Sequence, residues 1–261
     1  MDAQACAAAN ADVWRAKADA AAIDSGCGDA FVSACADSGA GTDMTADKLQ
    51  YVLDNRNVDA KVVMLTATHG HDDAWSRVYG GAWGPRREAV EVGVDLLGRA
   101  VYATLDFDEQ VSNETYGEFR LVYGPDSSTL VLPHNSAQHY ASTDGVLDED
   151  AVCGDLAWWS SRGDLAVAER ATEAASVPQS GWAHLVGGEQ DDFDLIETIS
   201  AGPLAATAVV AVRVRDSVAA TAVDGFFTAQ ALGEAPTVLE AVFSTLLTDP
   251  ELGPNVERIT P

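Results

Sequence analysis

The strongest constraint on the fold lies in residues 61–75, where an apolar run ends in a group of histidines and aspartates. The run at 62–65 is short and contains β-branched residues, as a buried strand would. His69 and His71 follow it, Gly70 lets the backbone bend between them, and Asp73 adds a carboxylate. Imidazole and carboxylate groups at this spacing suit a divalent, zinc-like ion. The stretch therefore predicts a buried strand that leads into a metal site; the alternative is a polar turn whose histidines only cap or hydrogen-bond.

The order of the other predicted elements indicates an α/β protein. We expect helices at 29–38, 45–55, 86–97 and 164–175, and strands at 61–65, 100–105, 119–123 and 129–132. The helix at 45–55 feeds the strand at 61–65, as in an αβ unit, and 39–43 is a loop between helices. A Gly-Pro-Asp turn after residue 123 predicts that the strands on either side of it form a hairpin. Residues 10–22 fit either a helix or two short strands at 11–15 and 20–23.

Further polar residues stand near other predicted strand ends. Asp24 lies in an Ile-Asp-Ser-Gly segment, and His134 and His139 follow the strand at 129–132. Asp155 ends a Gly-Asp pair after a short apolar approach, and His184 is the last histidine of the chain. Each of these residues alone fits an ordinary turn, loop or core position equally well.

In this order the motifs resemble those of the metallo-β-lactamase-fold hydrolases, over roughly residues 10–190. His69-Gly70-His71-Asp72-Asp73 is similar to the His-x-His-x-Asp-His signature of that family, although Ala74 stands where the family has its last histidine. The segment 133–139 is similar to the family loop that supplies a third metal histidine, with either His134 or Asn135 in that role.

The resemblance implies an αβ/βα sandwich of two facing mixed sheets with helices outside, and one or two zinc ions. The implied metal ligands are His69, His71, Asp73, His134, Asp155 and His184, with Asp73 and Asp155 orienting a metal-bound hydroxide, His139 binding substrate and Asp24 supporting the loops from beneath. The implied activity is hydrolysis of an ester, thioester, lactone or related bond in a small molecule. Because Ala74 cannot coordinate, the second zinc site is weakened. The alternative is a catalytically dead pseudoenzyme or a binding protein with the same fold.

Composition restricts the partners and the surroundings of the chain. Its 41 acidic residues against 15 lysines and arginines give a formal net charge of −26, and Lys17, Lys48 and Lys61 are its only lysines. This charge repels nucleic-acid phosphates, so no nucleic-acid partner is expected. It also suggests a salt-adapted cytoplasm, or else an ordinary acidic protein from a GC-rich genome.

The rest of the sequence predicts a soluble, cytoplasmic protein. No apolar run is long enough to span a membrane, and no signal peptide is recognised at the N-terminus. The four cysteines contain no Cys-x-x-Cys pair, so free and mostly buried thiols are expected. We assign residues 1–200 to the sandwich. Residues 201–261 fit helices or partly strands, and we expect them to complete or extend the same domain.

Overall fold

The computed structural model describes residues 1–107, 116–187 and 195–259. These residues form an α/β fold around one eight-stranded mixed sheet, in the order β10-β9-β4-β1-β3-β7-β5-β6, and a two-stranded sheet of β2 and β8. Neighbouring strands of the large sheet are antiparallel except for the pair β9 and β10. The α/β class is therefore confirmed, whereas the described strands do not include a second large sheet facing the first.

The strands are short and come from all parts of the chain. They are β1 (Gly39–Met44), β2 (Asn57–Val58), β3 (Ala100–Asp106), β4 (Phe119–Tyr123), β5 (Leu130–Leu132), β6 (Ala157–Trp158), β7 (Glu197–Ala201), β8 (Leu204–Ala205), β9 (Val209–Arg215) and β10 (Val256–Ile259). Residues after 200 contribute β9, which pairs with β4 near one edge of the same sheet.

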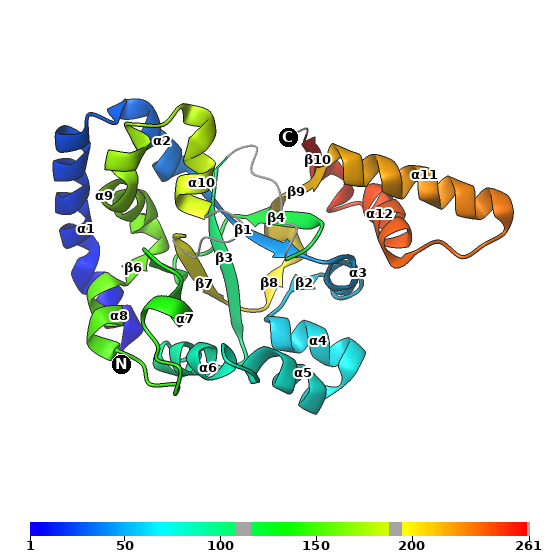
Figure 1. Cartoon of the computed structure of the whole chain (residues 1–261), viewed down its shortest axis with the longest axis horizontal. Helices are drawn as coiled ribbons and strands as arrows, with labels where there is room; N and C mark the ends of the chain where they lie inside the picture. Colours follow the sequence, from blue (N-terminus) through cyan, green and yellow to red (C-terminus); the bar gives the residue numbers. More distant parts are fainter. Residues whose placement is uncertain (108–115, 188–194, 260–261) are drawn as a thin grey trace.

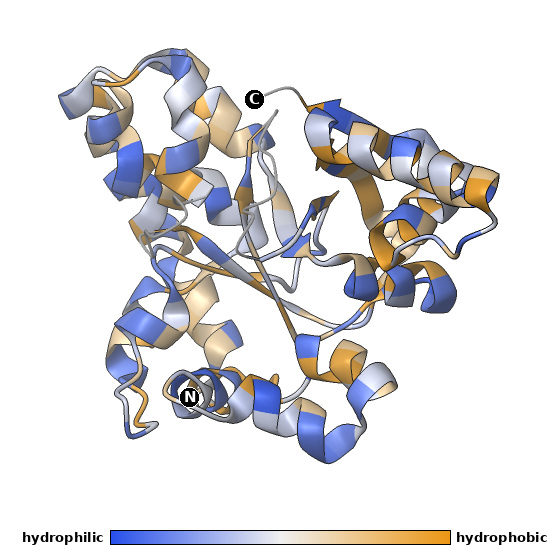
Figure 2. Cartoon of the chain, turned by 45° about the vertical axis from the view of Figure 1, so that its right-hand side comes forward, coloured by the Kyte–Doolittle hydropathy of each residue, from blue (hydrophilic) through white to orange (hydrophobic). Residues whose placement is uncertain are grey.

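The helices surround the sheet. They are α1 (Ala3–Ser25), α2 (Gly28–Asp37), α3 (Ala46–Asn55), α4 (Lys61–His69), α5 (His71–Tyr79), α6 (Gly84–Gly93), α7 (Ser136–His139), α8 (Glu149–Asp155), α9 (Arg162–Ala174), α10 (Trp182–Gly187), α11 (Asp216–Leu232) and α12 (Val238–Thr248). In Figure 1, α1, α2, α9 and α10 gather at one end of the sheet, and α11 and α12 extend at the other. Figure 2 shows hydrophilic residues recurring along the helices, as expected of a single layer that faces water on its outer side.

Both faces of the sheet are largely buried, and alternation along the strands divides the core. On one face of the sheet, Leu121 packs against α3, α11 and α12. Towards the other end of the same face, Leu105 and Val131 pack against α1, α2, α9 and α10. On the opposite face, Leu132 and Ile199 pack against α6 and α8. Burial on both faces explains why β4 is apolar at four of its five positions and buried at all of them.

The prediction of a strand at 61–65 is wrong, because these residues begin helix α4. A short apolar run fits both a buried strand and one turn of a helix, and periodicity alone does not separate them. Val62 packs into a small core with residues of α5, Met64 packs into the main core, and Val63 is 38% exposed. The Thr66 hydroxyl donates back to the Val62 carbonyl at 2.7 Å, inside the helix.

The predicted loop at 39–43 is also wrong, because it forms β1 at the centre of the sheet. Its glycines suggested a turn, but Gly41 has another reason to lack a side chain: a Cβ there would collide with the guanidinium of Arg120. The predicted hairpin does not form either. β4 pairs with β1 and β9, whereas β5 pairs with β6 and β7.

At the N-terminus, the helix alternative for 10–22 is right, since α1 runs without a break to Ser25. Gly26 ends it in the left-handed conformation at φ 66°, the usual conformation of a glycine C-cap. The helices expected at 29–38, 45–55, 86–97 and 164–175 and the strands expected at 100–105, 119–123 and 129–132 are confirmed, with ends shifted by a few residues.

The expectation of four free thiols is wrong for two of them. Cys6 of α1 and Cys153 of α8 form a disulfide, whereas Cys27 and Cys35 are free. Because disulfides persist mainly in oxidising surroundings, this bond argues against a reducing cytoplasm. Within the described residues, no helix is both long enough and apolar enough to cross a membrane.

Candidate functional site

The first predicted metal ligands lie at the junction of two exposed helices. His69 ends α4, His71 begins α5, and Gly70 at φ 78° turns the chain between them. His69 Nδ1 is 3.9 Å from an Asp73 oxygen, but that oxygen also accepts a 2.8 Å hydrogen bond from Arg77. The His71 ring instead stacks on Trp75 at 5.8 Å. The structure therefore brings His69 and Asp73 together and gives His71 another neighbour.

Ala74 is not an empty ligand position. It is fully buried and packs with Val62 and Val78 in a small core between α4 and α5. A histidine at this position would be forced into that core and would not face the exposed His69–Asp73 pair.

The later predicted ligands lie on other elements. His134 and His139 stack on each other with ring centroids 4.2 Å apart, and the Asn135 side chain caps α7 by accepting from the Gln138 amide. Asp155 ends α8, where it accepts a 3.0 Å hydrogen bond from the Tyr140 hydroxyl.

Neither Asp24 nor His184 follows a strand, contrary to the prediction. Asp24 is exposed near the end of α1, and His184 is exposed in α10. In the described part of the chain, no three side chains of His, Cys, Asp or Glu are grouped as metal ligands. The described residues therefore give no support to a common site for the predicted zinc ligands, and zinc binding stays a prediction.

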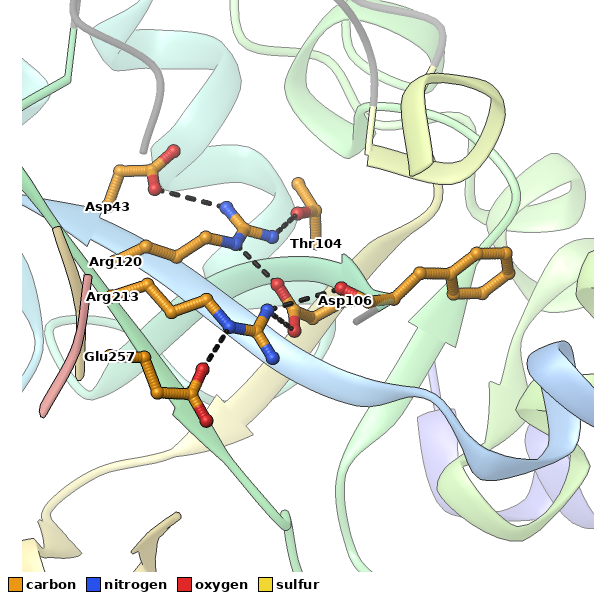
Figure 3. A network of polar contacts seen from close by, with 7 residues as sticks. Asp43, Thr104, Asp106, Arg120, Arg213 and Glu257 are labelled. Atoms are coloured by element: carbon orange, nitrogen blue, oxygen red, sulfur yellow. Dashed lines mark hydrogen bonds and ion pairs between the residues drawn. The ribbon is translucent and has the colours of Figure 1, made fainter. Parts of the chain in front are cut away.

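A row of alternating charges crosses one face of the sheet instead, and Figure 3 shows it from close by. The strand register places Asp43, Arg120, Arg213 and Glu257 side by side on β1, β4, β9 and β10. Asp106, at the end of β3, accepts from Arg120 on one oxygen and from Arg213 on the other, both at 2.5 Å. Asp43 and Glu257 complete the row at 3.0 and 2.8 Å from their arginines.

In this charge ladder every guanidinium has carboxylate partners. Asp106 and both arginines have side chains no more than 6% exposed. Buried charges are retained only when they are paired and hydrogen-bonded, so we assign the ladder to holding the strands in register. At one end of the ladder, the charge of Asp43 also acts on the Lys48 amine and favours its protonated form.

Three cations, Lys48, Lys61 and Arg87, influence one another's charge, and we call them the basic cluster. They come from α3, α4 and α6; in Figure 1, α6 lies near the lower end of β3, while α4 and α3 lie to the right of it. Among the described residues, Lys48, Lys61 and Arg87 make no hydrogen bond or ion pair, and the Arg87 guanidinium lies 4.5 Å from the centre of the Tyr102 ring. Elsewhere, arginines that hold a carboxylate are common: Arg15, Arg56, Arg77, Arg120, Arg213 and Arg258.

The charges of the basic cluster act on one another. Burial lowers the pKa of Lys61 to about 8, and the charges of Lys48 and Arg87 add to the effect. Burial also lowers the pKa of Lys48, and Arg87 lowers it further, while Asp43 and Glu118 oppose the shift. Lys61 therefore feels the positive charges of Lys48 and Arg87, in a chain whose acids outnumber its bases.

Beneath Arg87 lies a buried group of acids and tyrosines. Glu91 accepts from the Tyr79 hydroxyl at 2.5 Å and from the Gly98 amide at 2.9 Å. Glu197, on β7, accepts from the Ser136 amide at 2.8 Å. Burial raises the pKa of both carboxyl groups, and the charge of Arg87 opposes the rise at each. The positive charge of Arg87 thus acts on two sets of groups. It favours the charged forms of Glu91 and Glu197, and it lowers the pKa of Lys48 and Lys61.

One feature of the composition points to this site, although it is not part of any sequence motif: lysine is rare. Lysine occurs only three times in a chain with twelve arginines, and two of the three lysines are in the basic cluster. No model of a known protein family matches the chain, and no curated protein matches it either. The metallo-β-lactamase resemblance therefore stays a prediction from motifs, and the function has to be argued from the geometry.

Proposed function

We propose that the protein binds a small anion, a carboxylate or a phosphate, at Lys48, Lys61 and Arg87. The proposal is supported by the mutual electrostatic influence of Lys48, Lys61 and Arg87, for which the described part of this acidic chain shows no ion pair. Like charges held together raise the free energy of the folded state, and an anion among them removes that cost. Arg87 suits a planar carboxylate or phosphate, because a guanidinium can donate two parallel hydrogen bonds.

The net charge of the protein affects how anions approach the site, and this effect depends on distance and on salt. A net charge of −26 repels anions at a distance, but at physiological salt this repulsion is screened beyond about 8 Å. A small anion that reaches the basic cluster meets three positive charges at short range. We therefore expect binding to strengthen from very low to moderate salt, and to weaken again when chloride competes at molar concentration.

Isothermal titration calorimetry with inorganic phosphate and with pyruvate tests the proposal on the full chain. Lys48→Gln and Arg87→Gln should each weaken binding by roughly tenfold or more, the effect of losing one charged hydrogen bond. Lys17→Gln and Arg77→Gln are the matched controls, since both residues are exposed on other helices. Equal affinities in all five proteins, or no binding to any, would contradict the proposal.

Zinc-dependent hydrolysis stays a prediction, together with the sandwich fold on which it rests. The one contact in its favour is the 3.9 Å approach of His69 and Asp73. Elemental analysis after incubation with zinc would test it. Stoichiometric zinc that is lost in His69→Ala, but not in His184→Ala, would revive a metal site of different composition at the α4–α5 junction.

A further inference from the structure

A row of three aromatic rings runs along α5 from the surface into the protein. His71, Trp75 and Tyr79 stand four residues apart, so they lie on one face of the helix. The His71 and Trp75 rings stack with 5.8 Å between their centroids, and the Trp75 and Tyr79 centroids are 4.4 Å apart. His71 is exposed, Trp75 is half-buried and Tyr79 is buried. The row therefore connects solvent to a buried phenol through neighbouring rings.

The inner end of the row is built around the Tyr79 hydroxyl. It donates a 2.5 Å hydrogen bond to Glu91, as short as bonds from a hydroxyl to a charged carboxylate usually are. The Gly98 amide donates to the same carboxylate oxygen at 2.9 Å, and these hydrogen bonds favour the charged form of Glu91. Both side chains are buried. Tyr79 thus has a proton acceptor already in place, away from water.

The outer end of the row can be reached by small molecules. A hollow of about 550 Å³ is lined by His71, Asp72, Trp75 and Ser76. The Asp72 side chain is fully exposed there, and its charge and the net charge of −26 both attract cations. A cationic reagent in this hollow meets the indole of Trp75, whereas Tyr79 lies buried behind it.

We propose that Trp75 and Tyr79 form a redox relay, in which a small cationic one-electron oxidant at the surface ends by oxidising the buried Tyr79. Trp75 first gives one electron to the oxidant, which is reduced, and becomes an indole radical cation. One electron then passes from Tyr79 to Trp75, while the phenol proton of Tyr79 moves to Glu91. Trp75 is restored, Tyr79 becomes a neutral phenoxyl radical and Glu91 becomes a carboxylic acid, so atoms and charge balance.

The hydrogen bond to Glu91 and the contact with Trp75 together select Tyr79 among the tyrosines. Loss of an electron makes a phenol strongly acidic, so oxidation is easiest where a base already accepts the phenol proton. Tyr51 and Tyr140 also donate to carboxylates, at 2.8 and 3.0 Å. Among the described residues, however, only Tyr79 combines such a bond with a tryptophan ring beside it.

Photochemical oxidation of the full chain tests the relay. Illumination of tris(bipyridine)ruthenium with a cobalt ammine as terminal electron acceptor generates a cationic one-electron oxidant, and frozen samples are read by electron paramagnetic resonance. Ring-deuterated tyrosine in the protein narrows the spectrum of tyrosyl radicals and so identifies them. We expect Tyr79→Phe and Trp75→Phe, which keep an aromatic ring, to lose most of the tyrosyl signal. Tyr51→Phe and Trp83→Phe are the matched controls and should retain it, since Tyr51 also donates to a carboxylate and Trp83 is 48% exposed.

Two further measurements test the proton transfer. In Glu91→Gln the amide still accepts a hydrogen bond but cannot take the proton, so the radical should stay on Trp75 and give a tryptophan spectrum. In the wild type, the tyrosyl radical should form more slowly in D₂O, a check that needs no substitution. A tyrosyl signal that Tyr79→Phe or Trp75→Phe leaves unchanged, or that falls equally in their controls, would overturn the relay. A signal unchanged in Glu91→Gln, without any effect of D₂O, would overturn it as well.

Discussion

Asp106 is the residue on which the charge ladder depends most. Its two oxygens hold Arg120 and Arg213, so replacement by asparagine removes one charge and leaves an amide that can accept from only one of them. The two guanidinium nitrogens that share this carboxylate lie within about 7 Å of each other. At that separation two like charges repel by about 2 kcal/mol for an effective dielectric constant near 20.

The remaining contacts limit the damage. Arg120 keeps Asp43, and Arg213 keeps Glu257, so neither cation is left without a carboxylate. Breaking a buried ion pair usually costs about 3–5 kcal/mol, and we expect Asp106→Asn to fall near the lower end, at about 3 kcal/mol.

Equilibrium unfolding in urea, followed by tryptophan fluorescence, measures this loss directly. Asp73→Asn is the matched control, because Asp73 pairs with Arg77 at 2.8 Å with both side chains more than half exposed, and it should cost no more than about 0.5 kcal/mol. If the two substitutions cost the same, the ladder does not hold the strands in the way argued here. Arg213→Gln added to Asp106→Asn should cost less than the two separate losses combined, because it removes one of the facing cations.

Three other predictions follow from burial, cross-linking and surface charge. Changing Cys6 and Cys153 to serine should lower the free energy of unfolding by up to about 5 kcal/mol, which is the chain-entropy value for a loop closed over 147 residues. A loss below about 1 kcal/mol, measured by urea unfolding, would show that α1 stays in place without the disulfide. Because burial raises the pKa of Glu197, the unfolded chain loses this proton at lower pH than the folded chain; stability should therefore fall as the pH rises above about 4.5, and Glu197→Gln should show a smaller fall in a urea series across pH. The melting temperature of the wild type should rise between low and molar KCl as carboxylate repulsion is screened, and a flat or falling curve would reject salt adaptation.

The sequence by itself determined the elements whose signals are local. The helix at Ala46–Asn55 follows from Leu49, Val52 and Leu53 on one face, and the strand at Ala100–Asp106 from a short run rich in apolar residues. Such patterns involve residues that are close together in the sequence. They can therefore be recognised without knowledge of the tertiary structure.

Only the tertiary structure decided the elements and sites that depend on distant residues. Gly41 lies in a central strand through its pairing with β3 and β4, and Arg120 leaves no space for a side chain there. Residues 61–65 are helical in contact with α3 and α5. The basic cluster joins residues 48, 61 and 87 of three separate helices, and no spacing in the sequence marks them as neighbours. The free energy of charges depends on their separation in space, and this separation exists only once the chain has folded.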